Sequence, residues 1–320
     1  MATLAATAPV RRETEWSIAV AGVALVIFLV AAPFALYPVF IMKALCFALF
    51  ACAFNLLIGY VGLVSFGHAL YFGWAGYLAA HAAKVWGVPP ELAVLTGTAT
   101  GMALGLIAGV VAIRRQGIYF AMITLALAQM MYLVALRVKM TGGEDGIQGV
   151  PRGRLLGSFD LSNEMTMYAF VVIVVLAAFF LVYRIINSPF GEVLKAIREN
   201  EQRAVSLGYK TDDYKLVAFV LSATLAGLAG SLKALVFQLA SLTDVHWTMS
   251  GEVVLMTLVG GLGTIFGPIV GAFLIVAMEN YLAPFGQWVL VIQGAVFVIC
   301  VLAFRRGIVG ELAARLRVQL

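Results

Sequence analysis

Long stretches without a charged residue constrain this chain more than any other feature. They are residues 16–42, 44–83, 92–113, 116–136, 165–183, 253–278 and 280–304. Most of them reach or exceed the ~20 apolar residues that an α-helix needs to cross a bilayer. A β-barrel would require polar and apolar residues to alternate, which these stretches do not do. The sequence therefore predicts an all-α integral membrane protein, and a hydrophobic share of 63% excludes an ordinary soluble domain.

Eight spanning segments and one special region are predicted from these stretches. The segments are 17–37, 39–58, 62–85, 91–113, 117–137, 166–186, 216–240 and 286–304, and the special region is 251–280. We expect residues 1–320 to form a single transmembrane domain, a polytopic helical bundle. A hydrophilic inner loop at 187–215 and an outer loop at 138–165 connect its helices.

Basic residues set the expected orientation, because the cytoplasmic ends of membrane helices are rich in Lys and Arg. Placing both termini in the cytoplasm puts 14 of the 21 Lys and Arg residues on that side. They are Arg11, Arg12, Arg114, Arg115, Arg184, Lys195, Arg198, Arg203, Lys210, Lys215, Arg305, Arg306, Arg315 and Arg317. Arg152 and Arg154 in the outer loop are exceptions. The net charge of +5 therefore reports topology and does not predict a nucleic-acid partner.

The glycine-rich region 251–280 has to preserve this orientation. Segment 216–240 runs outward, so residues 241–304 must cross the membrane an odd number of times. Two full helical crossings need ~40 residues for a ~30 Å core, and the region has only 30. We therefore expect a re-entrant hairpin that turns at 260–264, followed by one crossing at 286–304. Two short tilted crossings keep the same parity, and either choice gives eight to ten transmembrane helices.

The inner loop is a long hydrophilic stretch between two membrane-length segments. Pro189 favours the first turn of a helix, and Asn200 can cap a second helix that begins at Glu201. Gly208 would end this second helix, and Ala204, four residues earlier, would share a face with it. Side chains this small let another backbone approach closely, so the pattern predicts a docking surface. A merely solvated connection is the alternative.

A helix with small residues in two adjacent rows follows this loop. Thr211 is expected to cap it, with Asp212 and Asp213 in the first turn. The rows are Ala218, Ser222, Ala226 and Gly230, and Ala223, Gly227 and Ser231. Small residues four apart let membrane helices pack closely. The pattern therefore joins a charged loop directly to a tightly packed helix.

The chain resembles the permease subunits of branched-chain amino acid ABC importers, of the LivM type. The inner loop is similar to that family's E-x-x-A-x-x-x-G element at Glu201, Ala204 and Gly208, although Gln202 and Arg203 replace small residues. Three further blocks carry the resemblance, namely residues 59–76, 117–151 and 251–271. Together they cover most of residues 40–305.

The resemblance implies the ABC importer permease fold and a subunit that translocates leucine, isoleucine, valine or related small substrates across a bacterial inner membrane. It implies two cytoplasmic ATP-binding subunits, a second homologous permease subunit and an extracytoplasmic substrate-binding protein as partners. Permeases of similar sequence also carry other amino acids, short amides and urea, so the substrate stays open. Whether the permease pair is a homodimer or a heterodimer stays open too.

Two glycine-rich stretches share a similar pattern. Residues 62–67 read Gly-Leu-Val-Ser-Phe-Gly, and residues 261–267 read Gly-Leu-Gly-Thr-Ile-Phe-Gly. Broken apolar segments in both halves of a transporter point to its transport pathway. Gly261, Gly263 and Gly267 are therefore candidate pathway residues, together with the first small-residue row. Ordinary glycine packing is the alternative.

Motifs of other function classes are not found in the sequence. The glycine-rich stretches lack the Gly-Lys-Ser/Thr ending of a phosphate loop, so we expect neither ATP nor another cofactor to bind. His68, His81 and His246 have no partners at metal-ligand spacing, and no catalytic constellation is visible, so the sequence predicts neither a metal site nor an enzyme.

Few charged residues fall at membrane depth. We expect Lys233 to pair with Glu252 across a packed interface. The alternative function, a self-sufficient secondary transporter or channel for a small polar solute, would need deep acidic or histidine residues as an ion relay, which this pattern lacks. The three cysteines lie in apolar stretches, so we expect Cys46, Cys52 and Cys300 to be small buried hydrophobes.

The outer loop contains a glycine-rich run at 140–151 with two adjacent carboxylates, Glu144 and Asp145. A connection this long in a helical bundle tends to be functional or disordered. We therefore expect Glu144 and Asp145 to dock a basic surface of the binding protein. A mobile connector is the alternative.

Overall fold

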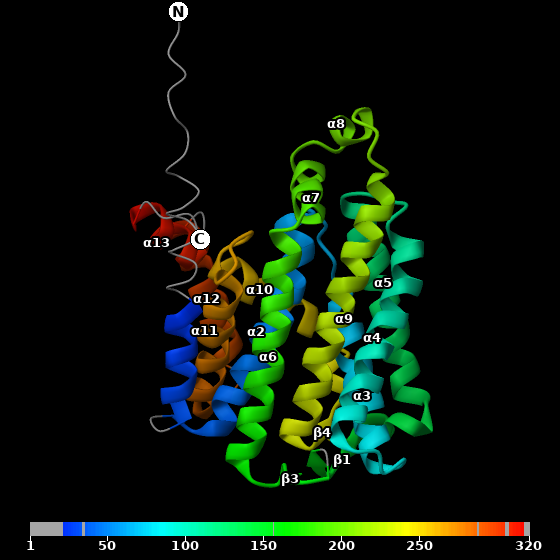
Figure 1. Cartoon of the computed structure of the whole chain (residues 1–320), viewed down its shortest axis with the longest axis vertical. Coiled ribbons are helices and arrows are strands. Elements are labelled where there is room, and N and C mark those ends of the chain that lie inside the picture. The colour runs from blue at the N-terminus through cyan, green and yellow to red at the C-terminus, as the bar shows by residue number, and fades with distance from the viewer. Residues whose placement is uncertain (1–21, 34–35, 156, 287, 305–306, 317–320) are drawn as a thin grey trace, which may run out of the picture.

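Long apolar helices run side by side in the computed structural model, which describes residues 22–33, 36–155, 157–286, 288–304 and 307–316 (Figure 1). Six helices of this part of the chain are long and apolar enough to cross a membrane. They are α2 (Pro38–Tyr60), α4 (Pro90–Ala112), α5 (Ile118–Arg137), α6 (Glu164–Ile186), α9 (Thr211–Phe237), and α11 (Gly267–Leu282) with its extension η4 (Ala283–Phe285). The predicted all-α, polytopic membrane fold is confirmed.

Four shorter apolar helices complete the described part of the bundle, namely a helix at Gly22–Pro33, α3 (His68–Lys84), α10 (Trp247–Gly260) and α12 (Trp288–Ala303). The shorter elements outside the apolar helices are η1 (Lys139–Thr141), η2 (Gly143–Asp145), α7 (Pro189–Glu199), α8 (Glu201–Ser206), η3 (Leu242–Asp244) and α13 (Gly307–Leu316). Part of the expected first segment, 17–37, lies outside the described residues, as do Arg11, Arg12, Arg305, Arg306 and Arg317.

The two ends of the bundle differ in structure. Helices α7 and α8 stand at one end, which we call the α7 end (Figure 1). The other end, the β1 end, carries four two-residue strands: β1 (Ile147–Gln148), β2 (Arg154–Leu155), β3 (Phe159–Asp160) and β4 (Leu239–Ala240). Strand β1 pairs antiparallel with β4, and β2 with β3. These ladders are too short to form a sheet layer, so the fold stays helical.

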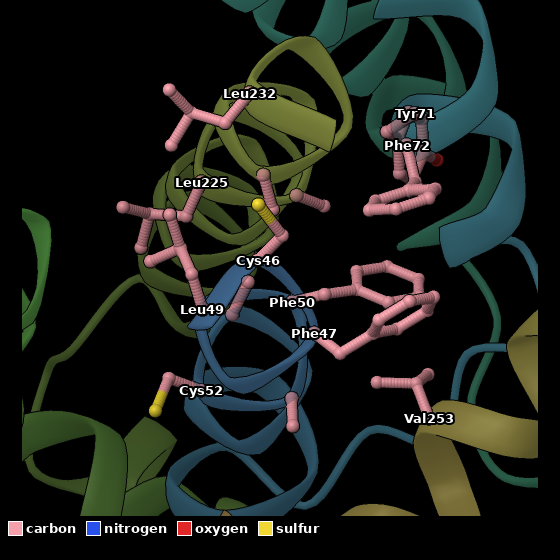
Figure 2. Packing of buried hydrophobic residues seen from close by; sticks show 14 of the residues in the cluster. Cys46, Phe47, Leu49, Phe50, Cys52, Tyr71, Phe72, Leu225, Leu232 and Val253 are labelled. Carbon is pink, nitrogen blue, oxygen red and sulfur yellow. The ribbon is translucent and has the colours of Figure 1, made fainter. Parts of the chain in front are cut away.

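Helix α2 lies at the centre of the core and is buried on nearly every side. Its Phe50 ring stacks on Phe72 of α3 with the centroids 4.5 Å apart, and Phe47 lies beside the same ring (Figure 2). Cys46 and Cys52 are buried in this core, as expected, whereas Cys300 is only partly buried. A helix that is apolar all round suits this central position, while α5 and α6 expose many apolar side chains that suit contact with lipid.

The two rows of small residues on α9 lie in close contact with neighbouring helices. The first row is fully buried, and a Cβ atom added to its Gly230 would overlap the carbonyl oxygen of Phe72 on α3. The second row faces α4, where a Cβ atom added to Gly101 would lie 2.9 Å from the Cα atom of Gly227. Helix α4 supplies a matching row of every fourth residue, Gly97, Gly101, Gly105 and Gly109. Such contacts bring backbones close together and let dispersion forces hold membrane helices.

Two helices begin inside the bundle after non-helical chain. Helix α3 follows the irregular stretch 62–67, and α10 follows the chain reversal 241–246, which holds only the single 3-10 turn η3. The backbone N–H of Ala69, in the first turn of α3, donates to Ser250 Oγ in the first turn of α10 at 2.9 Å. Helix α3 then runs to the β1 end, where Lys84 donates to the carbonyl of Gln148, and α10 runs to the α7 end. The two broken segments are therefore inverted relative to each other.

The glycine-rich region folds differently from the expected re-entrant hairpin. Helices α10 and α11 are joined by the turn 261–266, which lies at the α7 end, and α11 returns to the β1 end, where Glu279 pairs with Lys43 at 3.0 Å. The alternative of two short crossings fits this path. The expected region, 251–280, is too short: α10 begins earlier, at Trp247, and η4 extends α11 to Phe285, so the two crossings use more residues than the 30 on which the expectation rested.

Lys233 pairs with a different carboxylate from the one we expected. Its Nζ atom lies 2.6 Å from Asp244 Oδ2, and both side chains are largely buried. Asp244 belongs to η3, which folds back beside the end of α9, whereas Glu252 lies beside Glu279 of α11. The predicted Lys233–Glu252 pair is therefore wrong, because the chain reversal at 238–246 could not be placed from the sequence.

Close packing of α9 predicts a large effect of a single methyl group. Gly230→Ala should destabilise the protein by about 3 kcal/mol, since the new Cβ atom meets rigid backbone. Gly251→Ala in α10 is the matched control, because no atom lies within 4 Å of its Cβ position, and alanine favours a helix by up to ~1 kcal/mol. Thermal unfolding of the detergent-solubilised variants measures both effects. A Gly230→Ala variant that unfolds at the wild-type temperature would contradict the close contact.

Candidate functional site

The inner loop folds into two short helices that begin where the sequence predicted. Ser188 caps α7 by accepting from the backbone N–H of Gly191, and Pro189 occupies the first turn. The side chain of Asn200 accepts from the backbone N–H of Arg203 at 3.0 Å, so Asn200 caps α8 and Glu201 is its first residue. Each cap satisfies a backbone donor that has no helical partner. The expected helix starts are confirmed.

A tight turn separates α8 from α9. Gly208 has a φ of +91°, a left-handed conformation that favours glycine, and the backbone N–H groups of Leu207 and Tyr209 both donate to the carbonyl of Ala204. Lys210, not Thr211, occupies the N-cap position of α9. The Thr211 hydroxyl donates instead to Glu201 Oε1 at 3.2 Å. The expected Thr211 cap is therefore wrong, because this side chain turns back to α8.

Ala204 and Gly208 do not form one exposed face. Ala204 is only 2% exposed, so it is buried within the fold. Helix α8 ends at Ser206, so Gly208 does not lie on the same helix as Ala204. The most exposed apolar side chains here are those of Val205 and Leu207, at 54% and 70%. Together with their neighbours they form the α8 tip, residues 202–209, which offers an apolar surface at the α7 end.

A buried ion pair fastens α8 to α9. Lys215 of α9 is 1% exposed, and its ammonium donates to Glu201 Oε1. Asp212, one turn earlier, lies 4.0 Å away and is largely exposed, so Glu201 is the main counter-charge. The rings of Phe190 on α7 and Tyr214 on α9 stack with centroids 5.7 Å apart. These contacts join α7, α8 and the start of α9 into one unit, which we call the coupling segment (187–215).

The coupling segment also contacts both glycine-rich stretches. Arg198 of α7 donates to the carbonyl of Gly59 in the last turn of α2. Asn55 of α2 accepts from the backbone N–H of Gly263 at 3.0 Å and donates to the carbonyl of Thr264 at 2.9 Å. An open groove beside these contacts is lined by Gly59, Tyr60, Lys195, Arg198, Glu199 and Gly263. The structure thus brings together the end of α2, just before the irregular stretch 62–67, and the turn 261–266.

The other candidate pathway residues lie apart from this junction. Ser222 donates to the carbonyl of Ala53 and shares a hydrogen bond of 2.8 Å with His68 Nε2. Gly267 packs against Gly260 and Gly261 at the start of α11. No group of three His, Cys, Asp or Glu residues that could hold a metal ion occurs within the described residues. The small-residue row of α9 therefore contacts α2 and α3, whereas Gly267 contacts the end of α10.

The outer loop is folded at the β1 end. Glu144 and Asp145 lie exposed on η2, just before β1. Arg152 donates to the carbonyl of Val236 at 2.8 Å, which gives this basic residue a structural use at the end of α9. At the far side of the loop, a hydrogen bond from the backbone N–H of Ser162 lowers the pKa of Asp160.

Several residues of this site escaped the sequence reasoning. Arg198 and Asn55 make contacts across long sequence separations, and nothing in their immediate surroundings signals a partner. The glycine row of α4 was visible, since its members recur at every fourth position. Its regular spacing is the same signal that predicted the packing face of α9.

Comparison with protein families matches residues 37–301 to the family described as branched-chain amino acid transport system / permease component. The chain is 24% identical over 288 residues to the high-affinity branched-chain amino acid transport system permease proteins LivM of Salmonella typhimurium and Escherichia coli, covering 83% of this chain and 68% of each relative.

Further relatives match shorter parts of the chain. The probable branched-chain amino acid transport permease protein LivM of Methanocaldococcus jannaschii is 29% identical over 196 residues, 59% of this chain and 54% of that protein. The autoinducer 2 import system permease protein LsrC of Yersinia pseudotuberculosis is 28% identical over 152 residues, 46% of this chain and 42% of that protein. No solved structure matches the chain.

The buried Glu201–Lys215 pair yields a testable double-mutant cycle. Glu201→Gln should cost about 3 kcal/mol of stability, because it leaves the buried ammonium of Lys215 without its main counter-charge. Glu201→Gln with Lys215→Met should recover most of this loss, since no unpaired charge stays buried. Lys195→Met is the control, because its pair with Glu192 is exposed and is worth less than ~1 kcal/mol. Equal stabilities of the single and double variants in thermal unfolding would refute the assignment.

Proposed function

The chain belongs to the family of branched-chain amino acid transport permease components, and from this premise we propose that it is the membrane subunit of a binding-protein-dependent ABC importer. Its substrates would be leucine, isoleucine, valine or related small molecules. The chain would supply the path through the membrane, and partner subunits would hydrolyse the ATP. The relatives are transport permeases, in keeping with a subunit that has no catalytic role of its own.

One structural observation carries this proposal. The coupling segment presents the exposed α8 tip at the end of the bundle, and the buried Glu201–Lys215 pair fastens it to the closely packed helix α9. A force applied to the α8 tip is therefore received by a helix that contacts α2, α3 and α4. A chain without a nucleotide-binding motif needs such a connection, because reversing a two-state equilibrium from 1:99 to 99:1 takes about 5.5 kcal/mol of differential binding.

We assign partners to the two ends of the bundle. The α7 end would face the cytoplasm and two ATP-binding subunits, with Val205 and Leu207 as apolar contacts and the Gly208 turn holding α8 in place. The β1 end would face an extracytoplasmic binding protein, with Glu144 and Asp145 on the docking surface. A second homologous permease subunit would complete the path across a bacterial inner membrane. The basic residues Arg114, Arg115, Arg184 and Lys195 at the α7 end support this orientation.

Reconstitution in lipid vesicles tests the proposed function. The chain is reconstituted with its ATP-binding subunits, second permease and binding protein. The vesicles should take up labelled leucine only when ATP is supplied on the side of the membrane that carries the ATP-binding subunits. Omitting the binding protein or the ATP-binding subunits should reduce uptake to the level of empty vesicles. Uptake by the chain alone, driven by a proton or sodium gradient, would instead support the alternative, a secondary transporter.

Charge reversal on the outer loop tests the docking surface. Glu144→Lys with Asp145→Lys should lower binding-protein-stimulated ATP hydrolysis at least tenfold and leave basal hydrolysis unchanged, because like charges would repel a basic partner surface. The effect should weaken as salt rises, since exposed charges are screened.

The matched control changes the same net charge elsewhere in the outer loop. Asp160→Lys with Glu164→Lys alters two exposed acidic residues away from η2 and should retain stimulation. Full stimulation of the Glu144→Lys, Asp145→Lys variant at low salt would show that η2 is only a connector.

A further inference from the structure

Three distant parts of the chain meet at the α7 end of the bundle: helix α7, the last turn of α2 and the turn 261–266. Arg198 is the residue of α7 that reaches this meeting point, where its guanidinium donates to the carbonyl of Gly59. Carbonyls in the last turn of a helix have no helical partner and carry partial negative charge. A guanidinium therefore suits this position, because it makes a charge-assisted hydrogen bond there.

The side chain of Asn55, in the turn of α2 that precedes Gly59, fixes the turn 261–266 to this helix. Asn55 is 3% exposed, and its amide group both donates to Thr264 and accepts from Gly263. Both amide atoms are thus used on the backbone of one turn. The hydrogen bonds hold the turn one helical turn away from the carbonyl that Arg198 contacts.

Glycine residues bring these backbones into direct contact with Arg198. A Cβ atom added to Gly59 would lie 2.9 Å from the backbone nitrogen of Gly263. A Cβ atom added to Gly263 would lie 3.1 Å from Arg198 Nη1, and one added to Gly62 would lie 3.2 Å from Arg198 Cγ. Arg198 therefore lies against both glycine-rich breaks at once.

Each glycine-rich break is next to a helix that begins inside the bundle. The stretch after Gly62 leads to α3, and the turn 261–266 follows α10. The first turns of α3 and α10 meet in the interior through Ala69 and Ser250. A displacement at Arg198 thus acts on Gly62, which precedes α3, and on the turn that follows α10. The first turns of α3 and α10 are themselves in contact.

We propose that Arg198 is a positioning residue that transmits movement of α7 to both glycine-rich breaks, and so to α3 and α10. This inference rests on the proposed function, because it supplies the route by which ATP-driven movement of the coupling segment would reach the path. Lys195, one turn earlier on α7, lines the same groove but pairs with Glu192 of its own helix. Lys195 is therefore in the groove but is not part of the proposed route from α7 to the two breaks.

Uptake per ATP hydrolysed tests the inference in the reconstituted importer. Arg198→Ala should keep ATP hydrolysis within twofold of the wild type and lower uptake per ATP at least tenfold. Arg198→Lys should recover at least threefold over Arg198→Ala, because a lysine ammonium can still reach one carbonyl. Lys195→Ala should couple as the wild type does. Wild-type coupling by Arg198→Ala, or equal losses in Arg198→Ala and Lys195→Ala, would overturn the proposal.

Amide hydrogen exchange of the isolated chain separates this inference from the proposed function, since it needs no partner subunit. In Arg198→Ala, the amides of residues 59–64 and 261–266 should exchange at least fivefold faster than in Lys195→Ala, while those of α4 stay unchanged. Unchanged exchange at both breaks would overturn the role of Arg198 even if the importer transports leucine. A wild-type importer without ATP-dependent uptake would instead defeat the proposed function.

Discussion

Close approach of helix backbones is the constraint on which the rest of this structure depends. Apolar side chains gain little by leaving lipid for the interior of a membrane protein, so helices associate through packing and hydrogen bonds. Helix α9 meets this requirement with two faces of small residues, one against α3 and one against the glycine row of α4. Because α9 is held so closely, its two ends are fixed as well. One end carries Lys215 and the coupling segment, and the other carries the Lys233–Asp244 pair.

The interruptions in α3 and α10 obey a second rule, that backbone polar groups away from water need partners. Side chains provide many of them. Thr124 accepts from the backbone N–H of Phe66, Ser250 accepts from that of Ala69, and Asn55 serves the turn 261–266. These three polar side chains in an otherwise apolar bundle thus have a structural reason: each one binds backbone groups of a helix start or turn next to it. Irregular backbone within such a bundle is a feature of transport pathways in membrane proteins.

Patterns within a single segment were readable from the sequence, whereas contacts between segments were not. Apolar length predicted the helices, small-residue spacing predicted the packing faces of α9, and Asn200 predicted the start of α8. The partner of Lys233 depended on a chain reversal at 238–246, which no periodic signal marks. The burial of Ala204 depended on how α8 folds against α9 through Lys215. Arg198 looked like one more cytoplasmic basic residue, because a positive charge at a loop satisfies the topology rule whatever it contacts.

The two-residue ladder between β1 and β4 gives the outer loop a link to the interior. It pairs Ile147 with Ala240 and Gln148 with Leu239, directly after η2 and directly before the stretch that leads into α10. This ladder joins the outer loop directly to the chain that leads into α10. Linkage between two such sites is reciprocal. If a movement of α10 changes the free energy of closing this ladder, a molecule bound at the outer loop would act on α10 through the same ladder and by the same free energy.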